Sequence, residues 1–402
     1  MPKLLQIDSC LGVLSTGKIT EGIGSVARMN GWETYIAHSA RYVGTSDMVS
    51  YQIGSKCSEY LHYAKSLLFD KHGLGSSLQT RKLIRWIDGV NPDIIHLHCV
   101  HGYYLNYRIL FEYLKSTNIP VVWTFHDCWS FTGHCAHFVN VGCMKWKTEC
   151  FQCPLKHAYP KALVDNSTRN FKLKKYLLGG LQGNLTIVPV SNWLQGYVKD
   201  SFLQQNNIVT IHNGVDTTTF KQIEVLGYNG STKTILGVAS VWTKTKGLDD
   251  FILLREMLPA DVEIKLVGLT KEQIASLPSG VIGIERTHCV EDLVKLYSEA
   301  EVFVNPTYAD TFPTVNLESL ACGTPVITYR TGGSPEAVTS ETGIVVEQGN
   351  LESLKVAIMT VLNNGKEYYS QACRQRVEEY FDKNKCFQRY IDLYEDLLTR
   401  RE

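Results

Sequence analysis

Short runs of apolar residues recur along the chain, and a turn and a helical pattern follow each run. Because these runs do not alternate strictly between apolar and polar positions, they indicate strands that are buried on both faces, as in βαβ units. Ten runs predict strands: 4–8, 34–38, 93–100, 121–127 and 186–191 in one series, and 234–240, 263–268, 302–306, 325–329 and 343–347 in another. Two such series predict an α/β protein with two doubly wound, Rossmann-like domains.

A segment rich in turn residues, 212–231, separates the two series and is predicted to be the linker. We therefore expect an N-terminal domain over 1–215, a C-terminal domain over 216–374 and a final helix over 375–402. Ligands of open parallel sheets bind beyond the carboxyl ends of the strands. We expect the two sheets to face a central cleft, so residues that directly follow strands are the candidates for function.

The composition is that of a globular protein and argues against several classes. Of the 402 residues, 44% are hydrophobic and 20% are charged, and the formal net charge is zero. A general nucleic-acid binder is disfavoured because no overall positive field attracts phosphates. The first residues resemble a strand more than a signal peptide, and no apolar run approaches the roughly 18 residues of a membrane span. We expect the chain to reside in the cytoplasm.

The segment 305–338 carries the richest chemistry. A strand is predicted to end near Asn305, Asp310 follows in a polar loop, and a helix starts at Pro313 and stops at Gly323. The first turn of that helix offers free backbone N–H groups and a positive dipole end to a phosphate or a sugar hydroxyl. Acidic groups nearby would accept hydrogen bonds from hydroxyls. From spacing alone, a solvated aspartate and an ordinary surface helix remain an equal alternative.

These residues resemble the signature of family-4 glycosyltransferases with the GT-B fold. The resemblance rests on the spacing of Asp310 and Glu318, followed by Ala-Cys-Gly-Thr-Pro and Gly-Gly-Ser-Pro-Glu. It implies that Asp310 lies near the donor sugar, that Glu318 binds the ribose hydroxyls of the nucleotide, and that Thr314 and Val315 contact the donor. The family usually has Glu in place of Asp310, which keeps a catalytically weak nucleotide-sugar-binding or scaffold protein as an alternative.

Further motifs follow in the order that the family implies. Lys246, with Lys244 as the substitute for a missing arginine, corresponds to the loop that holds the diphosphate. Gly17, in the turn after the first strand, corresponds to a position near the donor phosphates. His126, at the end of the run 121–127, corresponds to a histidine near the anomeric centre, although a lone histidine at a strand end is more often structural.

The resemblance implies a retaining glycosyltransferase of the hexosyl-transfer type that needs no catalytic metal. The donor would be a UDP-sugar or a GDP-sugar, and the acceptor a saccharide or a lipid-linked saccharide. The likeness is greatest to bacterial enzymes that assemble colanic acid, capsule and related exopolysaccharides. His98 and His101 are candidate acceptor contacts, and the final helix is expected to cross back to the N-terminal domain. A nicotinamide-dependent oxidoreductase is less consistent, because the turn at 10–19 lacks a G-x-G-x-x-G pattern.

Membrane contact is a further expectation, because lipid-linked acceptors would bring the enzyme to the inner face of the cytoplasmic membrane. The segment 169–181 has basic and apolar residues that are compatible with an interfacial helix. An amphipathic helix on the surface of a soluble domain explains the same pattern.

A cysteine-rich excursion, 128–157, follows His126. Its cysteines at 135, 143, 150 and 153 end in a C-x-x-C pair, and four thiolates suit a structural zinc ion. Free buried or redox-active thiols and disulfides are the alternatives, and Cys128, His134 and His137 are alternative ligands. We expect Cys135, Cys143, Cys150 and Cys153 to brace the loop that positions His126.

Overall fold

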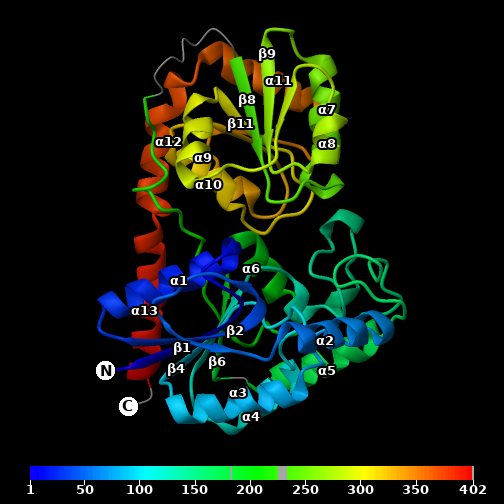
Figure 1. The fold of residues 1–402 in the computed structure, drawn as a ribbon, viewed down its shortest axis with the longest axis vertical. Coiled ribbons are helices and arrows are strands. Elements are labelled where there is room, and N and C mark those ends of the chain that lie inside the picture. Colours follow the sequence, from blue (N-terminus) through cyan, green and yellow to red (C-terminus); the bar gives the residue numbers. More distant parts are fainter. Residues whose placement is uncertain (182, 225–232, 401–402) are drawn as a thin grey trace. The chain divides into compact units, whose positions relative to one another are not determined.

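The computed structural model describes residues 1–181, 183–224 and 233–400, and its contacts group them into two compact units (Figure 1). The first unit comprises Met1–His212 together with the described residues from Phe387 onward, and the second comprises the described residues between Asn213 and Cys386. Residues 225–231 of the predicted linker lie outside the described part of the chain.

The first unit is built on a parallel sheet of seven strands in the order β3-β2-β1-β4-β5-β6-β7. The strands are β1 (Lys3–Leu11), β2 (Glu33–Val43), β3 (Val49–Gln52), β4 (Ile94–Leu97), β5 (Val121–Phe125), β6 (Leu185–Pro189) and β7 (Asn207–Ile208). The helices are α1 (Leu14–Met29), α2 (Lys56–Phe69), α3 (Ser77–Val90), α4 (Tyr107–Ser116), α5 (Ser167–Gly179) and α6 (Asn192–Lys199). Three short 3₁₀ helices, η1 (Trp129–Phe131), η2 (Val139–Val141) and η3 (Lys145–Lys147), lie in the cysteine-rich segment.

The second unit has a parallel sheet of six strands in the order β10-β9-β8-β11-β12-β13. The strands are β8 (Lys233–Val238), β9 (Val262–Val267), β10 (Val281–Ile284), β11 (Val302–Asn305), β12 (Val326–Tyr329) and β13 (Gly343–Val346). The helices are η4 (Lys244–Lys246), α7 (Leu248–Met257), α8 (Lys271–Ala275), α9 (Val290–Glu299), α10 (Thr314–Ala321), η5 (Ser334–Ala337), α11 (Leu351–Asn364) and α12 (Glu367–Tyr380). In Figure 1, α7 and α8 lie on one side of this sheet and α9 and α10 on the other.

All ten predicted strands are present, and the structure adds three that the apolar pattern missed. β3, β7 and β10 lie at sheet edges, where one side of a strand has no neighbour. β3 is largely exposed and β7 has only two residues, so neither shows the continuous apolar run of a central strand. The apolar pattern therefore detects the central strands and the edge strand β13, but it misses the other three edge strands.

The last helix, α13 (Lys383–Thr399), begins in the second unit and ends in the first. Within the first unit its Tyr394 hydroxyl lies 2.6 Å from His96 Nδ1, and Thr124 donates to Tyr390 over 3.1 Å. These contacts attach the helix to residues of β4 and β5. No helix in the described residues is both long and apolar enough to span a bilayer.

Candidate active site

An ion pair between Lys246 and Asp310 joins two loops that follow neighbouring strands of the second sheet. Lys246 comes after β8 and Asp310 after β11, and these two strands pair directly. The Lys246 ammonium lies 2.6 Å from one Asp310 carboxylate oxygen, while the other oxygen accepts a hydrogen bond from the Phe312 amide. The two side chains are 35% and 19% exposed, so the pair is partly open to a ligand.

The backbone around this ion pair is packed so closely that it leaves no room for larger residues. Gly247, next to Lys246, has φ +78°, and a Cβ there would lie 2.3 Å from the carbonyl oxygen of Pro306. The Tyr308 amide donates to the Thr245 carbonyl over 2.8 Å. Only glycine tolerates both the positive φ and this approach, so Gly247 fixes the loop of Lys246 against the loop of Asp310.

Helix α10 follows directly and presents its first turn beside Asp310. Pro313 occupies the N-cap position and makes no side-chain cap, and Thr314 and Val315 are the first two helical residues and are half-buried. The amides of a first turn have no partner within the helix. This end of α10 therefore combines backbone donors with the positive end of the helix dipole, as an anion site requires.

Glu318 lies one turn further along α10 and is half-buried. Its Oε2 accepts a hydrogen bond from the Tyr297 hydroxyl over 3.0 Å. Burial, and then the Glu318 charge, raise the pKa of Tyr297 well above its usual range, so this hydroxyl stays protonated and donates. The buried Asn305–Asn316 amide contact of 2.8 Å holds α10 against β11 and thereby fixes the position of Glu318.

Lys244 lies apart from the Lys246–Asp310 pair. Its side chain is 91% exposed, and its ammonium is 3.9 Å from the Asp249 carboxylate. In this structure only Lys246 of the two predicted lysines contacts Asp310. A lysine on the surface of a loop keeps its full hydration, so Lys244 exerts the weaker field.

In the first unit, the ends of β4 and β5 bring His98 and His126 together. The two strands pair with Leu97 beside Trp123, and the two histidines follow at their carboxyl ends. His98 Nδ1 lies 3.2 Å from His126 Nε2, and His98 Nε2 lies 3.2 Å from Gln6 Oε1. His98 is only 2% exposed, so its ring contacts His126 and Gln6 rather than solvent, and its expected contact with the acceptor stays a prediction.

Burial determines the charge state of both histidines. It lowers the pKa of His98 well below its usual range and that of His126 to about 4. The Asp127 charge opposes this shift for His126 but is the smaller effect. His126 is therefore a neutral imidazole near pH 7, able to donate or accept a hydrogen bond but not to supply a positive charge.

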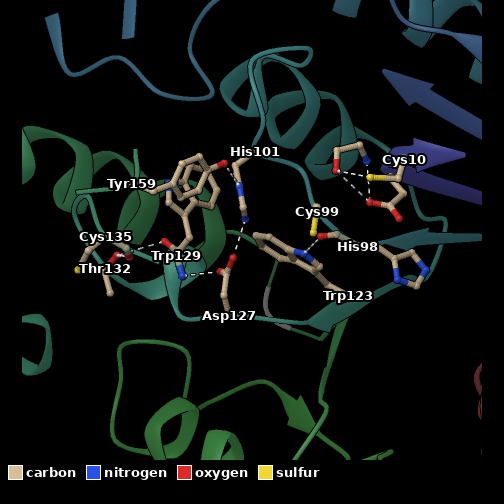
Figure 2. Close-up of polar contacts among 12 residues, drawn as sticks. Cys10, His98, Cys99, His101, Trp123, Asp127, Trp129, Thr132, Cys135 and Tyr159 are labelled. Atoms are coloured by element: carbon tan, nitrogen blue, oxygen red, sulfur yellow. Dashed lines mark hydrogen bonds and ion pairs between the residues drawn. The ribbon is translucent and has the colours of Figure 1, made fainter. Parts of the chain in front are cut away.

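Asp127, His101 and Tyr159 form a hydrogen-bonded chain that the sequence only partly predicted (Figure 2). His101 Nε2 lies 2.9 Å from Asp127 Oδ2, and His101 Nδ1 lies 3.1 Å from the Tyr159 hydroxyl. The second Asp127 oxygen accepts from the Trp129 amide. Burial alone would raise the pKa of Asp127, but His101 and the amide outweigh it and hold the pKa near 2.

His101 was predicted from its position after a strand, whereas Asp127 and Tyr159 were not. The signal for Asp127 was its place directly after His126, at a strand end. Tyr159 lies 58 positions from His101 and carried no comparable signal. An ionised Asp127 would keep the proton of His101 on Nε2, which leaves Nδ1 as an acceptor for a hydroxyl.

Gly17 lies in the first turns of α1, packed against the end of β1. A Cβ at this position would be 3.0 Å from the Cys10 Cβ and 3.2 Å from the Gly12 amide nitrogen. The glycine therefore lets the helix approach the strand closely. Beneath it, Asp8 is fully buried and accepts hydrogen bonds from Ser9 and Thr20, while burial raises its pKa.

All 12 cysteines are free, so the disulfide alternative finds no support in the structure. Among the described residues, no three His, Cys, Asp or Glu side chains are already arranged to hold a metal ion. Cys135, Cys143, Cys150 and Cys153 nevertheless line the same small cavity. The segment is well packed, with Phe131, Phe138 and Trp146 buried and in mutual ring contact.

Helix α5 contains most of the predicted interfacial segment, and three of its apolar residues face the protein. Phe171, Leu177 and Leu178 are buried. Lys174 is also buried and donates to the carbonyls of Trp129 and Thr132. Lys174 is therefore not available to a membrane surface, whereas Lys172, Lys175 and Tyr176 of the same helix are exposed, so membrane contact stays a prediction.

Known proteins resemble both units of the chain. The family model described as Glycosyltransferase Family 4 matches residues 31–219, and the model described as Glycosyl transferases group 1 matches residues 232–364. The candidate colanic acid biosynthesis glycosyl transferase WcaC of Escherichia coli K12 is 24% identical over 326 residues. That alignment covers 76% of this chain and 77% of WcaC.

Solved structures share the fold across the full length. Sucrose-phosphate synthase from Thermosynechococcus elongatus superposes with a TM-score of 0.72 at 16% identity, covering 100% of both chains. Alr3699/HepE from Anabaena, solved in complex with UDP-glucose, superposes with a TM-score of 0.63 at 14% identity and covers 98% of this chain and 99% of that one. The predicted GT-B architecture of two Rossmann-like domains is thereby confirmed.

Proposed function

Because the chain belongs to the glycosyltransferases of the group 1 and family 4 type, we propose that it moves a sugar from a nucleoside diphosphate sugar to an acceptor hydroxyl. The acceptor is a saccharide or a lipid-linked saccharide of a bacterial surface polysaccharide, in line with the likeness to WcaC. The observation that carries the proposal is the Lys246–Asp310 pair beside the first turn of α10, because it joins a phosphate-binding cation to a sugar-binding carboxylate.

The barrier to glycosyl transfer is charge separation. The sugar gains positive character at its anomeric carbon, while negative charge grows on the departing diphosphate. Lys246 and the amides of Thr314 and Val315 would stabilise that negative charge more in the transition state than in the ground state. Asp310 would hold the Lys246 ammonium in place, and its partly exposed carboxylate would also accept a hydrogen bond from a sugar hydroxyl.

Glu318 is proposed to bind the ribose. A carboxylate accepts hydrogen bonds from two neighbouring hydroxyls, and Glu318 keeps one oxygen occupied by Tyr297. The donor base remains to be chosen between uracil and guanine, and the complex of HepE with UDP-glucose favours UDP.

The first unit is proposed to supply the acceptor side. His126 would donate a hydrogen bond near the anomeric centre as a neutral imidazole, and His98 would hold it. His101, kept in one tautomer by Asp127, would accept the hydrogen bond of the acceptor hydroxyl in place of Tyr159. In this arrangement the acceptor hydroxyl is oriented but keeps its proton until the transfer step.

Retention at the anomeric carbon is part of the proposal. The acceptor oxygen attacks from the face that the diphosphate leaves, and a phosphate oxygen takes the acceptor proton as the glycosidic bond forms. The lysine and the helix amides carry out the charge stabilisation that a divalent cation performs in other transferases. Product analysis by NMR reports the anomeric configuration, and activity in the presence of a chelator reports the metal requirement.

The test of the function starts from binding. UDP-, GDP- and ADP-sugars are screened by thermal shift with the whole chain, since stabilisation grows with the logarithm of ligand concentration over Kd. We expect a shift with a UDP-sugar or a GDP-sugar that Glu318→Gln reduces. Absence of any shift with folded protein would contradict the proposal, whereas binding without transfer to any acceptor would favour a nucleotide-sugar-binding scaffold.

A further inference from the structure

The cysteine-rich segment encloses a cavity of about 20 Å³ that is large enough for one ion or one water molecule. The four cysteines expected from the sequence all line it, and His134 lines it too. These residues come from separate loops between positions 134 and 153, so the fold brings them together. Four cysteines and a histidine around one cavity are side chains of the kind that bind zinc in structural sites.

Two of the sulfur atoms already accept hydrogen bonds from the backbone. The Gly133 amide donates to Cys150 Sγ over 3.2 Å, and the Leu155 amide donates to the Cys153 sulfur. Cys153 also shares a hydrogen bond with Cys135. These backbone contacts fix where the sulfur atoms of Cys150 and Cys153 lie at the cavity.

A buried lysine, Lys174, contacts Thr132, which lines the cavity. The Lys174 side chain is 2% exposed, and no salt bridge to it occurs within the described residues. Its ammonium donates to two carbonyls and lies 3.4 Å from the centroid of the Trp129 ring. A buried ammonium is costly without a counter-charge, and neutral thiols do not provide one.

His134 adds an independent observation. Its Nδ1 lies 2.6 Å from the Asp70 carboxylate, and both side chains are at most 2% exposed. Its Nε2 is buried without a partner among the described residues. A histidine held by a carboxylate through one nitrogen, with the other nitrogen unpaired beside a cavity, is the arrangement that accompanies protein metal sites.

We propose that Cys135, Cys143, Cys150 and Cys153 bind one structural zinc ion in this cavity. Zinc prefers four tetrahedral thiolates in structural sites. Binding would replace the Cys135–Cys153 hydrogen bond with two zinc–sulfur bonds. The four thiol protons pass to solvent, and the site carries two negative charges that Lys174 and the N–H donors offset.

Zinc binding would also constrain the chain segment that connects Asp127 to Tyr159. The zinc ligands lie between Asp127 and Tyr159, the two partners of His101. A metal that cross-links residues 135 to 153 shortens the free length of chain between those partners. The ion would therefore hold the His101 hydrogen-bond chain in place without touching substrate.

The first experiment measures zinc in the full chain purified without chelator. We expect one zinc per chain by elemental mass spectrometry, and protection of the four ligand cysteines from alkylation that a strong chelator removes. Cobalt substitution should give the absorption of a tetrahedral thiolate site. This comparison uses the wild-type protein, so it is independent of variant folding. Less than one tightly held zinc per chain, also after reloading with zinc, would overturn the proposal.

The second experiment assigns the ligands. Cys150→Ser and Cys153→Ser should each lose at least tenfold in zinc affinity, whereas Cys57→Ser, at an exposed position outside the segment, should retain the full metal content. Loss of zinc in His134→Gln together with retention in Cys143→Ser would overturn the assignment of Cys143. Equal zinc content in all variants would overturn the site itself.

Discussion

Replacement of Lys246 by methionine tests the central electrostatic argument. The substitution keeps the length of the side chain and removes the charge that contacts Asp310 at 2.6 Å. Loss of one group that stabilises a developing oxyanion lowers kcat about 10²- to 10³-fold. Because the Lys246 side chain is 35% exposed, water screens part of its field, and we expect the lower end, about 100-fold or about 2.7 kcal/mol.

Lys244→Met is the matched control for this measurement. The Lys244 side chain is 91% exposed and its carboxylate neighbour is 3.9 Å away. An exposed charge of this kind contributes at most about 1 kcal/mol, so kcat should fall less than about fivefold. The assay is steady-state release of the nucleoside diphosphate, with the thermal midpoint confirming that both variants are folded. Equal losses in the two variants, or a loss below fivefold in Lys246→Met, would refute the reasoning.

Three further predictions follow from individual contacts. Glu318→Gln removes a charge at the proposed ribose site and should raise the donor KM about tenfold or more, with a small change in kcat. Steady-state kinetics separates the two constants, and an unchanged KM would contradict the assignment of Glu318 to the ribose. Gly22→Ala places a Cβ 2.2 Å from a ring carbon of Phe387 in α13, so the free energy of unfolding should fall by about 1–3 kcal/mol. Gly196→Ala, with nothing within 4 Å of its Cβ, should raise the free energy of unfolding slightly. Urea unfolding compares the two variants, and equal stabilities would contradict this packing. Burial lowers the pKa of His126 and His62 to about 4, so the unfolded chain takes up protons near pH 6.5 before the folded chain does. Stability should be complete above pH 6.5 and fall by about 1.4 kcal/mol per pH unit for each histidine toward pH 4, and equal unfolding free energies at pH 7 and pH 5 would reject this.

The central strands were predictable because burial on both faces leaves a continuous apolar record in the sequence. The helix α10 was predictable for a similar local reason, since Pro313 suits a helix start and Gly323 ends it with φ +71°. The edge strands β3, β7 and β10 show no such apolar run. Their residues are partly exposed, and their pairing is decided by the neighbouring strand rather than by their own composition.

The residues of the candidate site also fall into two groups, those that local motifs identify and those that they do not. Lys246, Asp310 and Glu318 were identified from motifs, because each lies directly after a strand or on the helix that follows. The chain from Asp127 through His101 to Tyr159 was not, because its members become neighbours only when two strand ends and a distant loop are placed together. Likewise the burial of His98 depends on Gln6, which belongs to another strand.

The sequence by itself determined the class of fold, the positions of ten of the strands along the chain and the residues at the carboxyl ends of those strands. These features follow from local periodicity and from the spacing of polar residues, which act over a few positions. Only the tertiary structure decided which lysine meets Asp310, which histidine is buried and where the charge of Lys174 resides. Those outcomes depend on how deeply a side chain is buried and on which distant segments pack against it. Neither can be read from the residue type at one position.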